Sequence, residues 1–144
     1  MTVFVSVTRL RVRVWRFVPA FLVLALRSAR QARAARGNVA VAVLAERRRT
    51  FWTRTLWDDE RAMRDFMRGE PHRRAMVKLA NWCDEASVVH WAQATADAPS
   101  WDEAWRRMQA EGRPSRVDHA TAAHIDFQIE APRLGGFGGE VRLK

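Results

Sequence analysis

The sequence has a single cysteine, Cys83, and this scarcity excludes two kinds of protein. An intrachain disulfide framework needs at least one cysteine pair, and the usual thiolate zinc sites need such a pair at fixed spacing. A reducing, cytoplasmic environment fits the chain best. Because no histidine signature flanks Cys83, we interpret it as a small buried hydrophobic residue rather than a nucleophile.

The chain also lacks an apolar run long enough to cross a bilayer. Residues 17–26 form an apolar run after a basic N-terminus, in the manner of a signal peptide or a short anchor. A membrane span needs about 20 apolar residues, and Arg16 and Arg27 bound this run. We therefore predict a buried helix here, and no membrane span.

Acidic residues are missing from the first part of the chain. The first acid is Glu46, and eight arginines precede it, namely Arg9, Arg11, Arg13, Arg16, Arg27, Arg30, Arg33 and Arg36. They account for nearly all of the net charge of +9. Such a block could bind nucleic acid or an anionic membrane surface. Arginines three residues apart are also typical of the solvated face of an amphipathic helix. We favour the solvated face, because no recognition motif accompanies the charge, and we do not expect nucleic acid as a partner.

Several catalytic and nucleotide-binding motifs are absent as well. The sequence contains no phosphate-binding glycine loop, nucleotide fingerprint, nucleophile elbow or HExxH motif. The glycines of residues 135–139 lack the preceding strand and following helix that give a phosphate loop its geometry. The function must therefore be sought in the fold and its cavities.

What the chain does have is the composition of one folded domain. It has 144 residues, of which 48% are hydrophobic and 28% charged, enough to bury a single core. Alternating or β-branched patterns predict strands over residues 3–10, 38–45, 49–57 and 86–93. Helical spacing predicts helices over residues 15–35 and from about 60 to 82, the second interrupted at Gly69-Glu70-Pro71.

The resulting order, β-α-β-β-α-β, is that of the ferredoxin-like α+β fold. It predicts a four-stranded antiparallel sheet with two crossover helices on one face. The other face would be bare, and packing against a copy of itself would cover it, so we expect a homodimer. We assign residues 1–111 to this domain, including a short helix over 100–111. Residues 112–144 are expected to form an irregular extension, with a possible strand over 125–129.

The two faces of the predicted strands differ in character. One set is bulky and apolar, and comprises Val3, Val5, Val7, Val39, Val41 and Val43. The other set mixes small, polar and aromatic side chains, and comprises Phe4, Ser6, Thr8, Ala40, Ala42, Thr53, Thr55, Trp57 and His90. Small and polar residues leave room beneath the helices for a ligand, or equally for large helix side chains. Both interpretations stay open.

His72 is the most informative single residue. At 100° per residue it falls in line with Met76, Leu79 and Cys83, on the stripe expected to face inward. The positive end of the helix dipole opposes protonation, so we predict a neutral imidazole able to accept a proton or to bind a metal or haem iron. The more common alternative is a structural histidine at the edge of the core.

Asp84 follows the second helix and is the candidate partner of His72. The carboxylate of Asp84 or Glu85 could orient a histidine that acts as a base. Turn formation is the ordinary role of such an aspartate. The predicted catalytic residues are His72 and Asp84. The predicted substrate-binding residues are Phe4, Ser6, Thr8, Trp57, Trp82 and His90. No metal site is predicted.

The element order and four short segments carry a resemblance to a known superfamily. The segments are residues 3–10, Phe51-Trp52-Thr53, Pro71-His72-Arg73 and Trp82-Cys83-Asp84-Glu85-Ala86. With them the chain resembles an uncharacterised bacterial branch of the dimeric α+β barrels, which include the antibiotic-biosynthesis monooxygenases. More distantly, residues 5–57 resemble spheroidene-monooxygenase-like proteins. The strand pattern extends the resemblance over roughly the first two-thirds of the chain.

The resemblance implies a dimer with one ligand pocket per subunit between sheet and helices. Members oxidise aromatic or polyketide substrates without a cofactor, bind and degrade haem, or have no known activity. The usual Asn-Trp-Trp constellation of the polyketide enzymes is not recognisable, although Asn81 and Trp82 are neighbours. The leading hypothesis is a small-molecule enzyme of monooxygenase-like type, without a cofactor or with haem. The alternative is a non-catalytic dimer that binds haem or a small hydrophobic ligand.

Overall fold

The computed structural model describes residues 2–133 and 139–144. These residues form one antiparallel sheet with the strand order β5-β4-β1-β3-β2-β6. The strands are β1 (Val3–Val12), β2 (Asn38–Glu46), β3 (Thr50–Trp57), β4 (Cys83–Gln93), β5 (Arg113–Pro114) and β6 (Glu140–Arg142). The helices are the 3-10 turn η1 (Trp15–Phe17), α1 (Val18–Ala34), α2 (Glu60–Arg68), α3 (Glu70–Trp82), α4 (Trp101–Glu111) and α5 (Ala122–Ile125).

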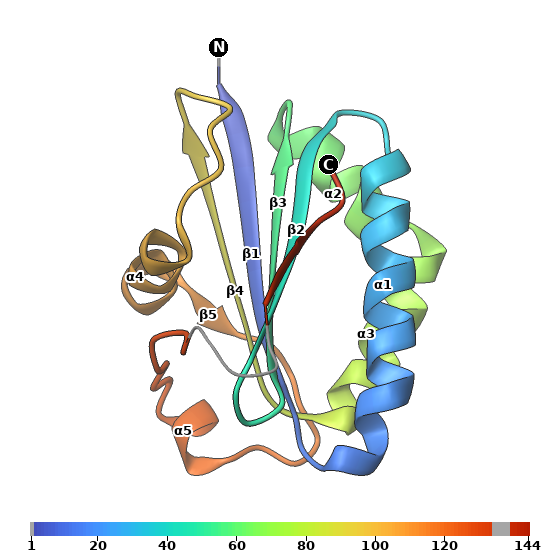
Figure 1. The fold of residues 1–144 in the computed structure, drawn as a ribbon, viewed down its shortest axis with the longest axis vertical. Helices are drawn as coiled ribbons and strands as arrows, with labels where there is room; N and C mark the ends of the chain where they lie inside the picture. Colours follow the sequence, from blue (N-terminus) through green and yellow to red (C-terminus); the bar gives the residue numbers. More distant parts are fainter. Residues whose placement is uncertain (1, 134–138) are drawn as a thin grey trace.

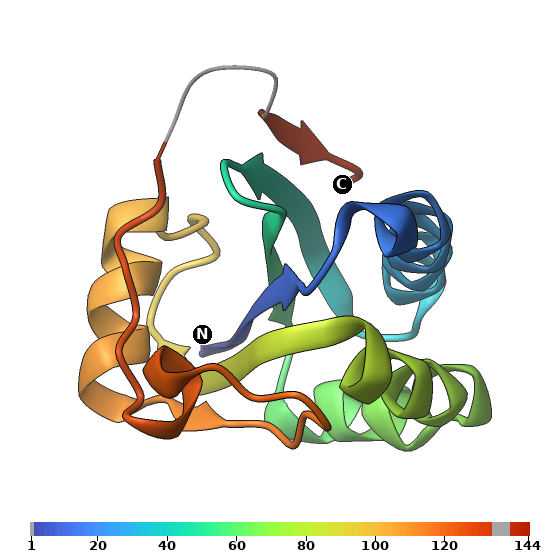
Figure 2. The same ribbon diagram turned by 90° about the horizontal axis from the view of Figure 1, so that it is seen from below.

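The helices α1, α2 and α3 form a layer on one face of the sheet (Figures 1 and 2). Gly37 turns the chain from α1 into β2 with a φ of 85°, a conformation that favours glycine. Asp59 caps α2 by accepting a hydrogen bond from the Ala62 amide, and Gly69-Glu70-Pro71 separates α2 from α3. The predicted α+β class, antiparallel sheet and β-α-β-β-α-β order are therefore confirmed.

The opposite face of the sheet, expected to be bare, is covered by the same chain. Helix α4 lies against it, as Figure 2 shows from below. Trp101, Ala104 and Met108 of α4 join Val5 and Val7 of β1 in one core cluster with strand residues and Ile129. Sequence periodicity located α4 but could not say where it docks, because that depends on contacts distant in the sequence. The expectation of a bare face is wrong.

The buried side chain of Arg54 helps to hold α4 in place. Its Nη1 donates to the Pro99 carbonyl at 2.7 Å, and its guanidinium lies 4.5 Å from the centroid of the Trp101 ring. Its Nη2 pairs with Glu140 of β6 at 3.0 Å. One side chain of β3 therefore connects the start of α4 to the C-terminal strand.

The sheet also has more strands than predicted. The prediction of four strands is wrong, because β5 and β6 come from the segment expected to be irregular. β5 pairs with Ser87 and Val88 of β4, and β6 pairs with residues 42–44 of β2. The possible strand over 125–129 is not formed. Instead Thr121 caps the short helix α5. Of the predicted glycine cluster, residues 135–138 lie outside the described residues.

The assignment of faces was correct for β1 but wrong for part of β2. Val41 and Val43 pair directly with Thr55 and Thr53, so they share the face toward α1 and α2. Ala42 faces α4 instead. A register shift between Asn38 and Ala40 reverses the alternation that the sequence predicts.

Among the described residues, no helix combines the length and apolar character that crossing a bilayer requires.

Candidate functional site

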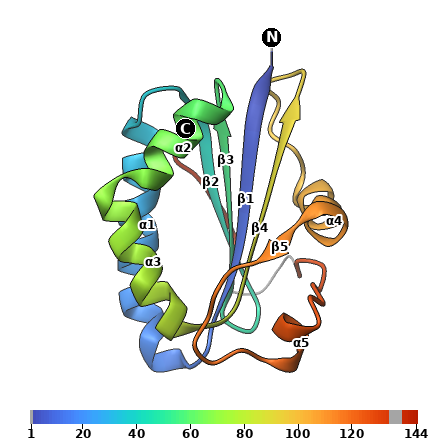
Figure 3. The same ribbon diagram turned by 180° about the vertical axis from the view of Figure 1, so that it is seen from behind.

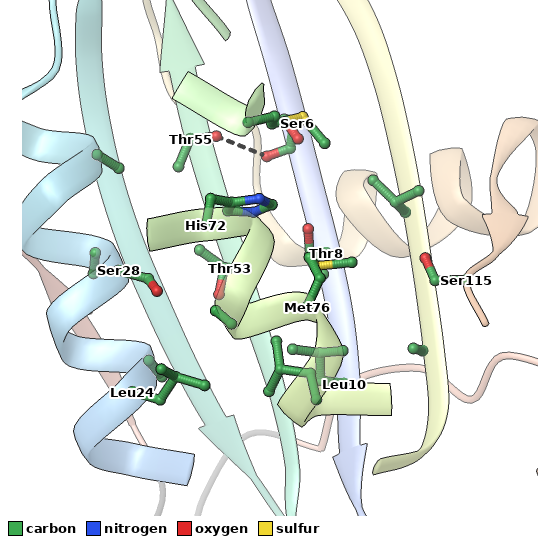
Figure 4. Close-up of a pocket in the computed structure, with 18 of the residues that line it drawn as sticks. Ser6, Thr8, Leu10, Leu24, Ser28, Thr53, Thr55, His72, Met76 and Ser115 are labelled. Carbon is green, nitrogen blue, oxygen red and sulfur yellow. Dashed lines mark hydrogen bonds between the residues drawn. The ribbon is translucent and has the colours of Figure 1, made fainter. Parts of the chain in front are cut away.

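A cavity of about 170 Å³ lies between the sheet and the helical layer. Its walls are mostly apolar side chains from α1, α2 and α3, including Phe21, Ala29, Met63 and Leu79. Polar residues also line the cavity, and Figure 4 labels all of them except Arg116. These are Ser6, Thr8, Ser28, Thr53, Thr55, His72, Ser115 and Arg116. A few polar groups in an apolar enclosure are typical of small-molecule sites.

The floor of the cavity carries a patch of hydroxyl groups. Ser6 and Thr8 of β1 pair directly with Thr55 and Thr53 of β3, so all four side chains point to the same face. The Thr55 hydroxyl donates to the Ser6 carbonyl at 3.4 Å (Figure 4) and accepts from Trp57 Nε1 at 2.9 Å. The Trp57 ring is thereby held as one wall of the cavity.

His72 lies in the first turn of α3 and brings the cavity its one imidazole among the described residues. Its ring meets Phe66 edge-on, with centroids 5.4 Å apart, and Phe66 lies 5.4 Å from Trp57. Burial lowers the pKa of His72, and a hydrogen bond with the Met67 backbone acts in the opposite direction. The direction agrees with the predicted neutral imidazole, and its main cause is burial.

The cavity brings together four of the predicted site residues, Ser6, Thr8, Trp57 and His72. The other four lie elsewhere, at Phe4, Trp82, Asp84 and His90. The ring of Phe4 lies 5.8 Å from His90, and that of Trp82 stacks on Phe17 at 6.3 Å. The adjacent Asn81 is exposed and accepts a hydrogen bond from Arg13, so it does not join the cavity either.

Asp84 belongs to a charged cluster where β4 begins. Its carboxylate lies 3.9 Å from Arg11 Nε, and burial raises its pKa against the opposing effect of Arg11. Glu85 pairs with Arg9 and Arg11, both at 2.9 Å. Within the described part of the chain, no hydrogen bond or ion pair joins Asp84 to His72. The predicted acid and base are therefore in separate environments.

Cys83 is fully buried, and burial raises the pKa of its thiol to about 12. The neighbouring Asp84 carboxylate acts in the same direction. The thiol therefore stays protonated at neutral pH, as befits a small hydrophobic residue. Cys83 lies in β4, beyond the end of the helical stripe that carries His72, Met76 and Leu79.

Several lining residues are not among the site residues predicted from the sequence. Ser28 could have been found, because it lies between Ala25 and Ala29 on the inward stripe of α1. Ser115 and Arg116 carry no such signal. They follow the two-residue strand β5, and only its pairing with β4 brings them to the cavity.

The fold and this cavity define the class of the protein as α+β, with a ferredoxin-like antiparallel sheet and a mostly apolar cavity between sheet and helices. Solved structures with a similar fold include proteins described as antibiotic biosynthesis monooxygenases. The resemblance drawn from the sequence is thus confirmed at the level of the fold. No family model matches the sequence, and no curated protein sequence matches it either.

Three of the similar structures illustrate the match. A variant of SnoaB, a cofactor-independent oxygenase from Streptomyces nogalater, is 17% identical with a TM-score of 0.54, and the match covers 67% of this chain and 95% of SnoaB. An antibiotic biosynthesis monooxygenase is 14% identical with a TM-score of 0.57, covering 64% and 98%. A conserved protein from Methanosarcina mazei is 17% identical with a TM-score of 0.57, covering 63% and 92%. About a third of this chain therefore lies outside each match.

Proposed function

We propose that the protein is a small-molecule enzyme of monooxygenase-like type, acting on an aromatic or polyketide-type substrate in the cavity. The observation that carries the proposal is His72, a half-buried imidazole with a lowered pKa that lines an apolar cavity floored by hydroxyl groups. An uncharged imidazole can accept a proton near neutral pH. The fold is shared with a cofactor-independent oxygenase, which supports the same chemistry.

In this reaction the substrate supplies the electrons itself. His72 accepts a proton from an activated carbon of the substrate, and the ring system stabilises the carbanion that forms. Dioxygen, the second substrate, reacts with that carbon. One oxygen atom becomes the carbonyl oxygen of the product, and the other leaves as water with the two hydrogens that the carbon has lost. The protein need only bind the substrate, move protons and exclude bulk water.

The cavity limits the size of the substrate. A cavity of about 150 Å³ lined by apolar side chains holds one benzene molecule, and this cavity measures about 170 Å³. One ring of a substrate therefore fits without rearrangement. Met76 both lines the cavity and is exposed, so the rest of a larger molecule would extend toward solvent beside it.

The same volume disfavours haem. His72 has the chemistry of an axial ligand, but a haem macrocycle is several times larger than a benzene ring. The cavity does not fit haem with the side chains as they lie, and we derive no step through it.

The test is turnover with and without the imidazole. Wild type is mixed with aromatic ketones that carry an activated CH2 group, and oxygen uptake is recorded beside ligand binding by calorimetry. Substitution His72→Gln should lower turnover by about a hundredfold to ten-thousandfold, the usual contribution of a general base, and leave affinity within a few-fold. His90→Gln is the control, because His90 is also half-buried with a lowered pKa but does not line the cavity.

The alternative, a non-catalytic ligand-binding protein, gives a different result. Wild type would then bind the aromatic compounds without consuming oxygen, and His72→Gln would change affinity alone. Oxygen uptake that persists unchanged in His72→Gln would remove the role of His72 while leaving the cavity as a site.

The homodimer also stays a proposal. The sheet face through which we expected it is occupied by α4, so a dimer would need another surface. Light scattering across a range of protein concentrations would show whether a dimer forms.

A further inference from the structure

The outer surface of the helical layer combines exposed apolar residues with exposed cations. Helices α1 and α3 lie side by side on the side of the sheet away from α4 (Figures 2 and 3). We call their outward surface, with the preceding turn η1, the α1–α3 outer face. Its exposed apolar residues are Trp15, Leu22, Val23, Leu26, Met76 and Val77.

These side chains are unusually open to solvent for their type. Trp15 is 68% exposed, Val23 59% and Val77 75%. On α1 the spacing of Leu22, Val23 and Leu26 places them within one outward arc of the first turns, while Phe21, Ala29 and Ala32 are buried on the inward side. Apolar residues gathered on one exposed surface mark an interaction site more often than scattered ones do.

The charge around these residues is mostly positive, with one ion pair between Arg74 and Glu70 at 2.7 Å. Helices α1 and α3 carry six exposed cations, and their only acid is Glu70 at the start of α3. The cations are Arg27, Arg30, Arg33, Arg73, Arg74 and Lys78. On the opposite side of the molecule α4 is balanced, since Arg106 and Arg107 pair with acids of the same helix. The excess of cations is therefore a property of one face.

We propose that the α1–α3 outer face docks on an anionic membrane surface. A peripheral helix binds such a surface with its apolar side chains at the level of the headgroups, while basic residues pair with anionic lipids. Tryptophan suits this interface because its ring is apolar and its N–H is polar. Trp15, directly before α1, stands in that position.

The other occupants fit less well. A second copy of the chain would bring two cation-rich faces together, and like charges across an interface oppose association. Nucleic acid would attract the arginines, but its phosphate backbone has no apolar surface that would bury Val23 or Val77. An anionic bilayer matches both the charge and the apolar side chains.

The experiment is co-sedimentation of the whole chain with lipid vesicles. One set is phosphatidylcholine alone, and the other contains phosphatidylglycerol as well. We expect the protein to pellet with the anionic vesicles, weakly with the neutral ones, and less in high salt because salt screens the attraction.

Two variants separate the apolar and the electrostatic contributions. The double variant Val23→Asn, Val77→Asn should lower partitioning about tenfold, because both side chains leave water on binding. The triple variant Arg27→Gln, Arg30→Gln, Arg33→Gln should lower it by roughly fivefold for each arginine. The matched controls are Ile125→Asn, at a residue 73% exposed on α5, and Arg106→Gln on α4, and both should bind as wild type does.

Three results would overturn the proposal. The first is no binding to anionic vesicles in low salt. The second is binding that only the arginine variant reduces, which would indicate a general affinity for polyanions. The third is a mass that doubles with concentration and that Val23→Asn, Val77→Asn returns to that of a monomer, which would assign the face to a second copy. Folding of each variant is checked by circular dichroism. None of these outcomes depends on turnover in the cavity.

Discussion

At the scale of single residues, the burial of His72 links the candidate site to the stability of the fold. The pKa of His72 is lowered in the folded state, mainly by burial. Below about pH 6.5, the ordinary value for histidine, the unfolded chain therefore binds more protons at this position than the folded one does. The contribution of His72 to the free energy of unfolding therefore rises with pH through that range and falls as the solution becomes more acidic.

The direction of this pH dependence gives a test of the environment of His72 that is independent of catalysis. Urea unfolding is measured at about pH 7.5 and about pH 5.5, on either side of the ordinary histidine value. We expect wild type to lose stability at the lower pH, and His72→Gln to lose less, because glutamine does not titrate. His90→Gln should show a change in the same direction, since burial also lowers the pKa of His90. An identical loss in wild type and His72→Gln would mean that His72 titrates freely in the folded protein.

Residues whose positions depend on a local pattern could be predicted from the sequence. His72 follows from helical spacing, and Ser6 and Thr8 from strand alternation, and all three line the cavity. Asp84 could not be placed in the same way. Its surroundings depend on the register of β4 against β1, which brings it to Arg11 rather than to His72.

At the scale of elements, the turn between β2 and β3 carries backbone strain. The three residues between the paired Glu46 and Thr50 are arginines, and Arg48 and Arg49 have φ values of 62° and 60°. At positive φ a residue with a Cβ atom is higher in conformational free energy than glycine is. The two arginines differ in their contacts. Arg49 Nε donates to the Val12 carbonyl at 2.8 Å, whereas Arg48 is exposed.

Arg48→Gly should therefore raise the free energy of unfolding by about 0.5 to 1 kcal/mol. Arg49→Gly should gain less or lose stability, because it also removes the hydrogen bond to Val12 and the contact with Trp15. Urea unfolding of the two variants beside wild type is the measurement. Equal effects would show that the side chain of Arg49 adds nothing to the hairpin.

Sequence patterns predicted the elements themselves more fully than their packing. Helix α1 and the break at Gly69 follow from capping residues and spacing within one segment. The position of α4 does not, because it depends on Trp101 and Met108 meeting residues of β1 far away in the sequence. The same holds for β6, whose few residues pair with β2 without a local pattern of their own.

At the scale of the whole molecule, Arg54 connects parts of the chain that the sequence keeps far apart. Its side chain is 4% exposed and reaches Pro99, Trp101 and Glu140 from the middle of β3. Burial lowers the pKa of Arg54, and Glu140 opposes that effect. Removing one partner of a buried ion pair is costly because the remaining groups lose their hydrogen bonds.

Arg54→Met should lower the free energy of unfolding by about 2 to 4 kcal/mol, somewhat less than for a fully buried pair because Glu140 can reach solvent. Arg142→Ala is the matched control. Arg142 pairs with the same Glu140 at 3.3 Å but is itself exposed, so its loss should cost less than about 1 kcal/mol. Chemical denaturation measures both values. A similar loss in the two variants would contradict the role of Arg54 as the connection.

The C-terminal residues 139–144 have a further consequence for β2. The Ala45 amide donates to Gly139, the Leu143 amide donates to the Val41 carbonyl, and β6 pairs with residues 42–44 in between. An outer strand with free amides and carbonyls is a template onto which foreign chains can add. Here that template is already filled from within. Addition of a foreign strand to β2, a first step toward fibrillar aggregates, would require residues 139–144 to detach from it.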